Sequence, residues 1–375
     1  MAHDVDLVAR LLAFETRHVR PVATHRQVAV RPDALVVCPI AMAGEDTTIH
    51  AVAYGGIGQA PRVLCVPDPR QRDDQYRLFE QLGAEFEVLF VACRSHGAYP
   101  QLWVSSGAAA SHLDTLADRL RYNRDNPTVK RFGELLSFAT ERFPIAGQQA
   151  LHTATGVLRA HWATGQQAGE DEHLGALLAW FDDSDDVFSA VAAAELVPMG
   201  VKTDPDFDRD VLEPLVTAYN EARRAGASRE VLSRHAAAIR EALTPVATRV
   251  YDATQRAIAI FLEADLPPLG DLAELERIEA KSFGSFMASR DAGYGLPLRD
   301  SPKAAVYKFT AREDAVENVE AAIRLGDRVG RTRATLAGQL LAGRVVDVRR
   351  LAAGPHRVLF ELDIESGQKA HLAMK

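Results

Sequence analysis

The stretch VLCVPDPRQRDDQYRLFEQL, residues 63–82, decides the expected fold class because it joins two different periodicities. It opens with a short apolar run over 63–66, which is typical of a buried strand. Pro67 and Pro69 end that run, since proline is a poor fit inside a paired strand. From residue 71 onward, apolar side chains recur at helical spacing and predict a helix over 71–86. A strand that passes directly into a helix favours a layered fold built from both kinds of element.

The same succession of short apolar runs and helical stretches extends through residues 1–125. Expected strands occupy 27–30, 34–40, 49–54, 63–66, 88–93 and 102–104, and expected helices occupy 4–19, 71–86 and 108–121. The middle strands are apolar throughout rather than alternating, so we expect helices on both of their faces. Residues 1–125 are therefore predicted to form an α/β, or α+β, domain.

Beyond residue 125 the pattern becomes helical, with interruptions rich in proline, glycine and aspartate. Expected helices occupy 128–142, 147–163, 171–181, 186–196, 209–225, 228–265, 271–290 and 302–342. Pro245 lies inside the longest of them and is expected to kink or break it. We therefore predict a large all-α middle region, with a helical domain over 126–266 and a helical segment with a basic face over 267–342. Residues 343–375 return to short apolar runs and predict a small β-ribbon or partial barrel.

Composition places the chain among globular proteins, with 375 residues of which 47% are hydrophobic and 25% charged. No apolar run approaches the roughly 18 residues of a membrane span, and the first residues lack the basic and apolar pattern of a secretory signal. Cys38, Cys65 and Cys93 each lie in an apolar run without CxxC spacing, which is typical of buried thiols in a reducing compartment. We expect a cytoplasmic protein without a membrane partner. Only 7 of its 43 basic residues are lysine, a bias that favours a bacterial source.

Charge is distributed unevenly along the chain, whose net charge is −8. Residues 281–375 carry 16 Lys and Arg against 11 Asp and Glu, so this part is +5 and residues 1–280 are −13. Seven arginines gather where the expected basic helix meets the terminal β segment: Arg324, Arg328, Arg331, Arg333, Arg344, Arg349 and Arg350. The first three are spaced to share one helix face. A basic face of this kind can contact the phosphates of DNA or RNA, or it can pair with the acidic part of the chain itself.

Three carboxylates in the N-terminal region stand where a metal-dependent nuclease would need them. Glu15 lies on the first expected helix, Asp33 precedes one strand, and Asp68 ends another with Arg70 two residues later. The order of these elements resembles the PD-(D/E)XK nuclease superfamily, as does a glutamine with an aromatic residue four positions on, here Gln75 and Phe79. The resemblance implies that Glu15, Asp33 and Asp68 hold Mg²⁺ and activate a water molecule. No other cofactor is predicted.

A structural interpretation of the same residues stays open beside the nuclease. The family's lysine is replaced by Arg70, which stays protonated and does not substitute for a catalytic lysine. Asp68 and Pro69 also fit a helix start, with Asp68 as the cap and Pro69 in the first turn. Similarly, the alternating carboxylates of TDPDFDRD, residues 203–210, fit either a Ca²⁺ loop or the acidic N-terminus of a helix.

These patterns lead to three functional hypotheses. The first is an accessory or regulatory protein in bacterial nucleic-acid metabolism, which contacts DNA, RNA or a protein partner through the basic C-terminal face and is not itself an enzyme. On this hypothesis the domain over 1–125 is a degenerate nuclease-like module or a docking platform. The second is a Mg²⁺-dependent nuclease that uses Glu15, Asp33 and Asp68. The third is a non-catalytic scaffold whose helical middle binds another protein.

Overall fold

The computed structural model describes residues 21–23, 26, 28–42, 48–95, 101–121, 126–140, 151–163, 173–182, 203–264, 266, 272–292, 306, 309–310, 313, 331–332, 334, 343–350 and 358–364. The chain divides into two compact units, Met1–Phe309 and Thr310–Lys375. Each unit is described by itself below.

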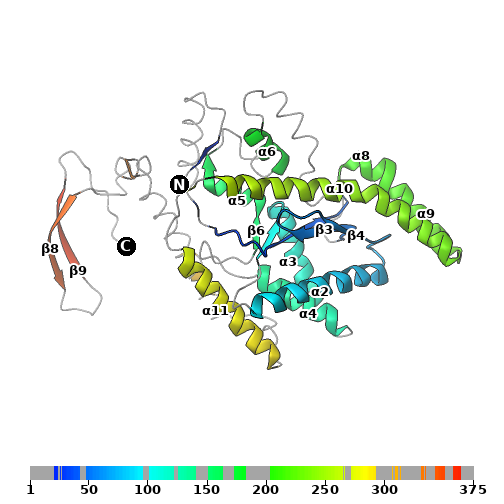
Figure 1. Ribbon diagram of the computed structural model, residues 1–375, viewed down its shortest axis with the longest axis horizontal. Coiled ribbons are helices and arrows are strands. Elements are labelled where there is room, and N and C mark those ends of the chain that lie inside the picture. The colour runs from blue at the N-terminus through cyan, green and yellow to red at the C-terminus, as the bar shows by residue number, and fades with distance from the viewer. Residues whose placement is uncertain are drawn as a thin grey trace. The chain divides into compact units, whose positions relative to one another are not determined.

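A five-stranded mixed sheet forms the centre of the first unit (Figure 1). Its strands are β2 (Leu35–Ile40), β3 (Ala51–Gly56), β4 (Arg62–Cys65), β5 (Leu102–Val104) and β6 (Leu151–Thr153). Their spatial order is β4-β3-β2-β5-β6. β2, β3 and β4 form an antiparallel meander, and β5 and β6 continue the sheet in parallel beside β2. The predicted mixture of strands and helices in the N-terminal region is thereby confirmed.

Helices cover both faces of this sheet, as the apolar strands predict (Figure 1). One layer contains α2 (Arg72–Ser95), α3 (Gly107–Arg121), α4 (Pro127–Thr140) and α11 (Leu272–Asp291), and the other contains α5 (Ala154–His161), α6 (Leu174–Asp182) and α10 (Arg229–Glu263). Successive residues of a strand face opposite sides of the sheet. Accordingly Val36 and Cys38 belong to the core that α10 covers, whereas Val37 belongs to the core beneath α2.

A continuous helical run precedes the turn into α10. It consists of α8 (Pro205–Phe207), the wider turn η2 (Asp208–Leu212) and α9 (Glu213–Arg224). Asp204 caps the run, because its side chain accepts a hydrogen bond from the Asp206 amide at 2.6 Å. Arg209 pairs with Asp206 at 2.8 Å and with Asp210 at 2.7 Å. These carboxylates therefore have local partners at a helix N-terminus, which agrees with the structural interpretation of the acidic stretch.

The strand predicted over 88–93 is wrong, because those residues continue α2 as far as Ser95. Neither glycine nor proline separates Phe86 from this apolar run, so the helix has no reason to end there. A short apolar run fits a helix as well as a strand, and Val88 is in fact 70% exposed. Residues 28–30, also predicted within a strand, are not part of one.

The sheet extends past the predicted boundary at residue 125. Within the single helix expected over 147–163, the described residues 151–163 form instead β6, α5 and the short strand β7 (Trp162–Ala163). β7 pairs with β1 (Val22–Ala23). Thr153 ends β6 and caps α5, since its hydroxyl accepts a hydrogen bond from the Gly156 amide at 3.1 Å. A strand of three residues within a helical pattern gives too weak a signal to be predicted.

Pro245 does not interrupt α10, which is one helix from Arg229 to Glu263. The ring of Pro245 lies on the exposed side of the helix, while Leu243, Val246 and Ala247 are buried in the core. Packing on both sides of the proline therefore outweighs its local cost, which is about 3 kcal/mol in an isolated helix.

In the second unit, β8 (Gly343–Arg350) and β9 (Val358–Ile364) pair in antiparallel fashion, with a bulge between Val345 and Asp347. Across the described part of the chain, no helix is both long and apolar enough to cross a membrane.

Candidate functional site

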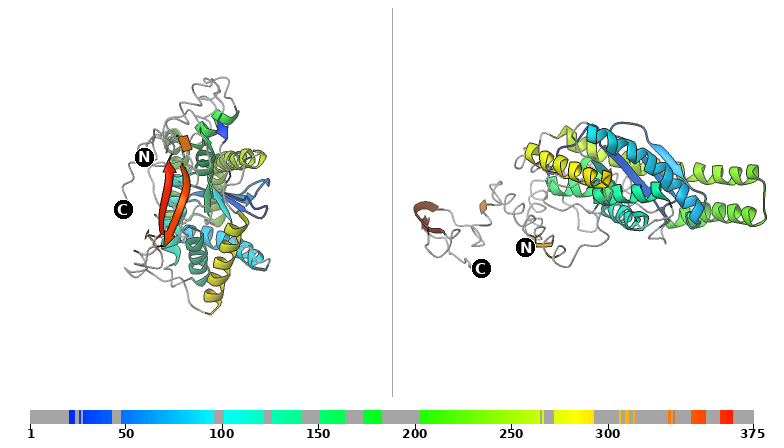
Figure 2. Two further views of the ribbon diagram at one scale, coloured as in Figure 1. Left: turned by 90° about the vertical axis from the view of Figure 1, so that its left-hand side faces the viewer. Right: turned by 90° about the horizontal axis from the view of Figure 1, so that it is seen from below.

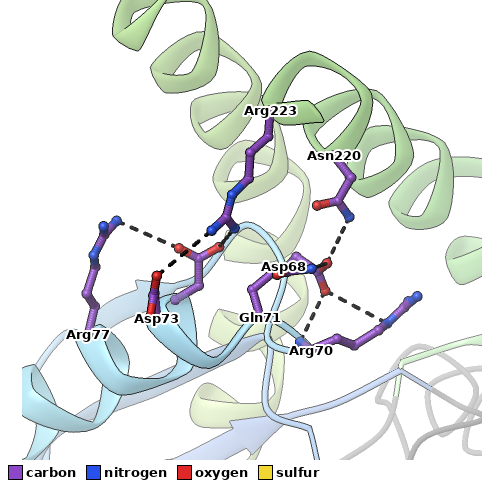
Figure 3. A network of polar contacts seen from close by, with 8 residues as sticks. Asp68, Arg70, Gln71, Asp73, Arg77, Asn220 and Arg223 are labelled. Atoms are coloured by element: carbon purple, nitrogen blue, oxygen red, sulfur yellow. Dashed lines mark hydrogen bonds and ion pairs between the residues drawn. The ribbon is translucent and has the colours of Figure 1, made fainter. Parts of the chain in front are cut away.

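Asp68 lies in the loop between β4 and α2 and is almost fully buried, with 2% of its surface exposed. One carboxylate oxygen accepts a hydrogen bond from the Arg70 amide at 3.1 Å, and the Arg70 guanidinium lies 3.8 Å from it. The other oxygen accepts from the side-chain amides of Gln71 at 3.3 Å and of Asn220 at 2.8 Å. Asn220 reaches Asp68 from α9, as Figure 3 shows.

Asp68 therefore closes a turn and does not cap α2. Its side chain bonds the amide two residues on, its carbonyl accepts from the Gln71 amide at 2.9 Å, and α2 begins only at Arg72. Such a local turn is a common role of aspartate after a strand. The predicted helix start at Pro69 is thus two or three residues too early.

Arg223 makes a second connection between α9 and the first turn of α2 (Figure 3). Its guanidinium lies 3.8 Å from the carboxylate of Asp74 and 4.0 Å from that of Asp73. Asp74 is only 3% exposed, and Arg77 approaches its other oxygen at 3.7 Å. Burial raises the pKa of Asp74, and the two arginines oppose that rise. The following eight residues are called the Asp68 network: Asp68, Arg70, Gln71, Asp73, Asp74, Arg77, Asn220 and Arg223.

His50 borders this network at the start of β3 and is fully buried. Burial, followed by the positive charge of Arg70, lowers the pKa of His50 to about 4, and the nearby Asp68 carboxylate partly opposes this. The imidazole is therefore neutral at pH 7. A neutral histidine beside a carboxylate that already accepts three hydrogen bonds contributes packing rather than charge to this corner of the sheet.

The predicted metal ligands are not brought together. Asp33 precedes β2 and pairs with Arg31 at 2.9 Å, whereas Asp68 follows β4 at the other end of the sheet, since Ile40 and Cys65 both register with Ala51. β2 alone separates the two ends by about 17 Å, which is too far for one shared ion. Glu15 lies outside the described residues. Where the structure is described, no three His, Cys, Asp or Glu side chains are placed to hold a metal.

The donors around Asp68 also argue for a structural role. Both of its oxygens already accept N–H groups from Arg70, Gln71 and Asn220. A cation at the same oxygens would face these positive ends of N–H bonds, instead of the oxygen ligands that Mg²⁺ prefers. The arrangement can hold α9 against the sheet, and three of the carboxylate's acceptor positions are already used by N–H donors.

Beyond the network, α9 and the start of α10 project from the first unit as an antiparallel pair (Figures 1 and 2). Residues 213–240 of this pair are called the helical arm. Its last fully buried side chain on α9 is Tyr219, and its first on α10 is Ile239. Residues 220–238 have none. Because α10 begins ten residues before Ile239, it extends about 15 Å beyond its first fully buried side chain, and in that length Leu232 and Ala236 pack against the core while half-buried.

The base of the arm is fastened at a second place, beside the end of β2. The Thr203 amide donates to the Ala41 carbonyl at 2.9 Å, and the Thr203 hydroxyl bonds both that carbonyl and the buried carboxylate of Asp208. Together with Asn220 and Arg223, this contact holds the base of the arm at one end of the sheet, where β2 and β4 both finish.

The arm carries arginines of two kinds. Arg223 is paired within the Asp68 network, and Arg234 pairs with Glu230 one turn away at 3.7 Å. The side chains of Arg224, Arg229 and Arg240 are exposed and form no ion pair with any described residue. These three are called the tip arginines; Arg224 and Arg229 flank the turn at the end of the arm, and Arg240 lies three helical turns back, next to the buried Ile239.

Three of the C-terminal arginines that the sequence singled out lie in the described strand β8, namely Arg344, Arg349 and Arg350. Arg344 is exposed and registers opposite Asp363, and Asp347 registers opposite Glu361. Acidic positions thus interleave with basic ones. Arg331 is exposed, and the other three predicted residues, Arg324, Arg328 and Arg333, lie outside the described residues.

No family model matches the chain, and neither a curated protein nor a solved structure is significantly similar to it.

Sequence reasoning identified Asp68 but missed its partners on α9. Asn220 and Arg223 are three residues apart in a helix and so share a face, which is the only local signal they give. Asn220 lies 152 positions from Asp68, and only the folded chain brings the two together.

Proposed function

We propose that this chain is a non-catalytic interaction protein that presents the helical arm to a macromolecular partner. The observation that carries the proposal is the uncovered length of the arm, in which residues 220–238 contain no fully buried side chain. Most helices in globular proteins gain their stability by packing an apolar face. Over about 15 Å beyond Ile239 the apolar side chains of α10, such as Leu232 and Ala236, are only half-buried where they pack against the core. We infer that the exposed face of this length is a surface that another molecule uses.

The Asp68 network supports the same proposal because it restrains the base of the arm. The hydrogen bond from Asn220 to Asp68 and the pairing of Arg223 with Asp74 join α9 to α2 at two points about one turn apart. A restrained arm loses less conformational freedom when it binds, so more of the contact energy appears as affinity. Asp68 thus contributes to binding because it fixes the position of α9, although it does not itself contact the partner.

The test uses a photoreactive benzophenone side chain at Ser233, which is exposed on the arm, and at Thr115, which is exposed on α3, as the matched control. Each full-length variant is irradiated in the cells that express the chain naturally. We expect a discrete crosslinked species from position 233 and none from position 115. Equal crosslinking at both positions, or none at position 233, would contradict the proposal.

A further inference from the structure

We infer that the partner of the arm is a nucleic acid, whose phosphate backbone is contacted by the tip arginines, Arg224, Arg229 and Arg240. This inference rests on the proposed function and names the class of molecule that the arm binds. It moves the proposed nucleic-acid contact from the C-terminal ribbon, where acidic positions interleave, to the exposed side of the helix pair.

Charge is the first argument. Residues 221–240 contain five arginines and two glutamates, a net charge of +3 on a chain whose total is −8. Residues 1–280 carry −13 in total, so without this segment they carry −16, and the segment is a basic site on an acidic part of the chain. A basic site on an acidic molecule attracts and orients a polyanion through one end. The tip arginines have no described carboxylate that would neutralise them.

Spacing is the second argument. Arg229 and Arg240 are eleven residues apart in one helix, which is close to three full turns, so they share a face about 16 Å apart. Ser233 and Ala237 lie between them on the exposed side and are small enough to let a partner approach. Arg224 stands across the turn at the end of α9. A phosphate backbone repeats its charge every few ångströms and can supply anions over this whole length.

The apolar surface of the arm is the third argument, and it decides between nucleic acid and protein. Protein interfaces are centred on large apolar or aromatic anchors. Residues 203–264 are fully described, and their exposed large hydrophobic residues are Val211 and Leu262, both outside the arm. An interface without such anchors depends on charge and hydrogen bonding, as contacts to phosphates do.

The guanidinium groups of arginine bind phosphates with better-defined geometry than the ammonium groups of lysine do. Arginine presents a planar fork of donors that binds two phosphate oxygens at once. All five basic residues of the tip segment 221–240 are arginines. Because backbone contacts carry no base information, we expect binding to duplex DNA of any sequence.

The experiment measures fluorescence anisotropy of a labelled random-sequence 20-base-pair DNA duplex with the full chain between about 50 and 200 mM salt. The test variant combines Arg224→Gln, Arg229→Gln and Arg240→Gln. The control variant removes the same charge through Arg62→Gln, Arg131→Gln and Arg256→Gln, which are exposed arginines in ion pairs outside the arm. Circular dichroism confirms that both variants fold.

If each tip arginine contacts one phosphate, the slope of log affinity against log salt falls by about 2.7 in the test variant. The three contacts then account for about a 40-fold loss of affinity of the unaltered chain over that salt range. The control variant keeps the original slope. Unchanged binding by the test variant, an equal loss in the control, or no binding at the lowest salt would overturn the inference. A protein crosslinked at Ser233 without DNA binding would leave the proposed function standing, whereas failure of both assays would remove both.

Discussion

Replacement of Asp68 by alanine should lower the free energy of unfolding by about 3 kcal/mol. Asp68→Ala leaves the Asn220 amide and the Arg70 amide without the acceptor they now have at 2.8 and 3.1 Å. A hydrogen bond to a charged group contributes about 1.5 kcal/mol or more, and a donor left unsatisfied in a buried site costs a similar amount. The variant also loses the weaker hydrogen bond from Gln71, at 3.3 Å. The cost of that loss is offset by the benefit of removing a buried charge, so the total stays at about 3 kcal/mol.

The assay is urea denaturation followed by circular dichroism, which reports the free energy of unfolding in water. Asp33→Ala is the matched control, because Asp33 is also a carboxylate paired with an arginine but lies on the surface. Its loss should cost no more than about 1 kcal/mol. Asn220→Ala should destabilise in the same direction as Asp68→Ala. The double variant should cost less than the sum of the two, since both remove the same hydrogen bond.

The effect of Mg²⁺ on the free energy of unfolding distinguishes a structural role of Asp68 from the metal-binding role that the nuclease hypothesis gives it. If Asp68 held Mg²⁺, the ion at about 100 times its dissociation constant would stabilise the unaltered chain by about 2.7 kcal/mol and would not stabilise Asp68→Ala. We expect the unfolding curves of both to be insensitive to Mg²⁺. The structural role of Asp68 would be refuted by equal costs for Asp68→Ala and Asp33→Ala, or by a Mg²⁺-dependent stability that the Asp68 variant loses.

Two further predictions concern the core on either side of the sheet. His50 has a pKa of about 4 in the folded chain, below its ordinary value of 6.5, so the unfolded chain takes up a proton first as the pH falls. The free energy of unfolding should therefore decrease by about 2 kcal/mol between pH 7 and pH 5 because of His50. In urea titrations at both pH values, His50→Gln should show a decrease that is smaller by this amount. Gly55→Ala should destabilise by about 1–3 kcal/mol, because the added methyl would lie 2.6 Å from the Tyr251 hydroxyl, which is held by its hydrogen bond to a backbone carbonyl at 2.9 Å. The same substitution in a Tyr251→Phe background should cost clearly less in thermal denaturation, and an equal cost in both backgrounds would show that the hydroxyl is not the obstacle.

Regular elements with a clear period could be predicted from the sequence. The strand β2 and the helix α10 both follow the expected ranges closely, because long or strongly apolar patterns reflect burial directly. The tail of α2 could not be predicted, since the run from Val88 fits either kind of element. The short strand β6 could not be predicted either, because its three residues join the sheet only through pairing with β5.

The candidate site shows a different limit of sequence reasoning. Asp68 stands out because prolines flank it at the end of a strand, and that local signal is real. The role of Asp68 depends on Asn220 of α9, which donates a hydrogen bond to one of the carboxylate oxygens. A buried carboxylate that binds a metal and one that accepts N–H donors look alike in sequence, since burial and partners are tertiary properties. The arm has the same limit. The sequence predicts its two helices, but it does not predict that residues 220–238 have no fully buried side chain.

The adjacent residues Arg223 and Arg224 have different roles in the arm, because one faces the base and the other is exposed. Arg223 faces Asp73 and Asp74 at the base, whereas Arg224 has no described carboxylate partner. Arg223→Gln should therefore lower the free energy of unfolding by about 1–2 kcal/mol, since the buried Asp74 keeps only Arg77 as an ion-pair partner. It should leave the salt dependence of DNA binding unchanged. Arg224→Gln should do the reverse, with unchanged stability and a slope smaller by about 0.9. The two variants carry the same charge, so a shared effect on both measurements would mean that net charge alone governs the arm and that the Asp68 network does not orient it.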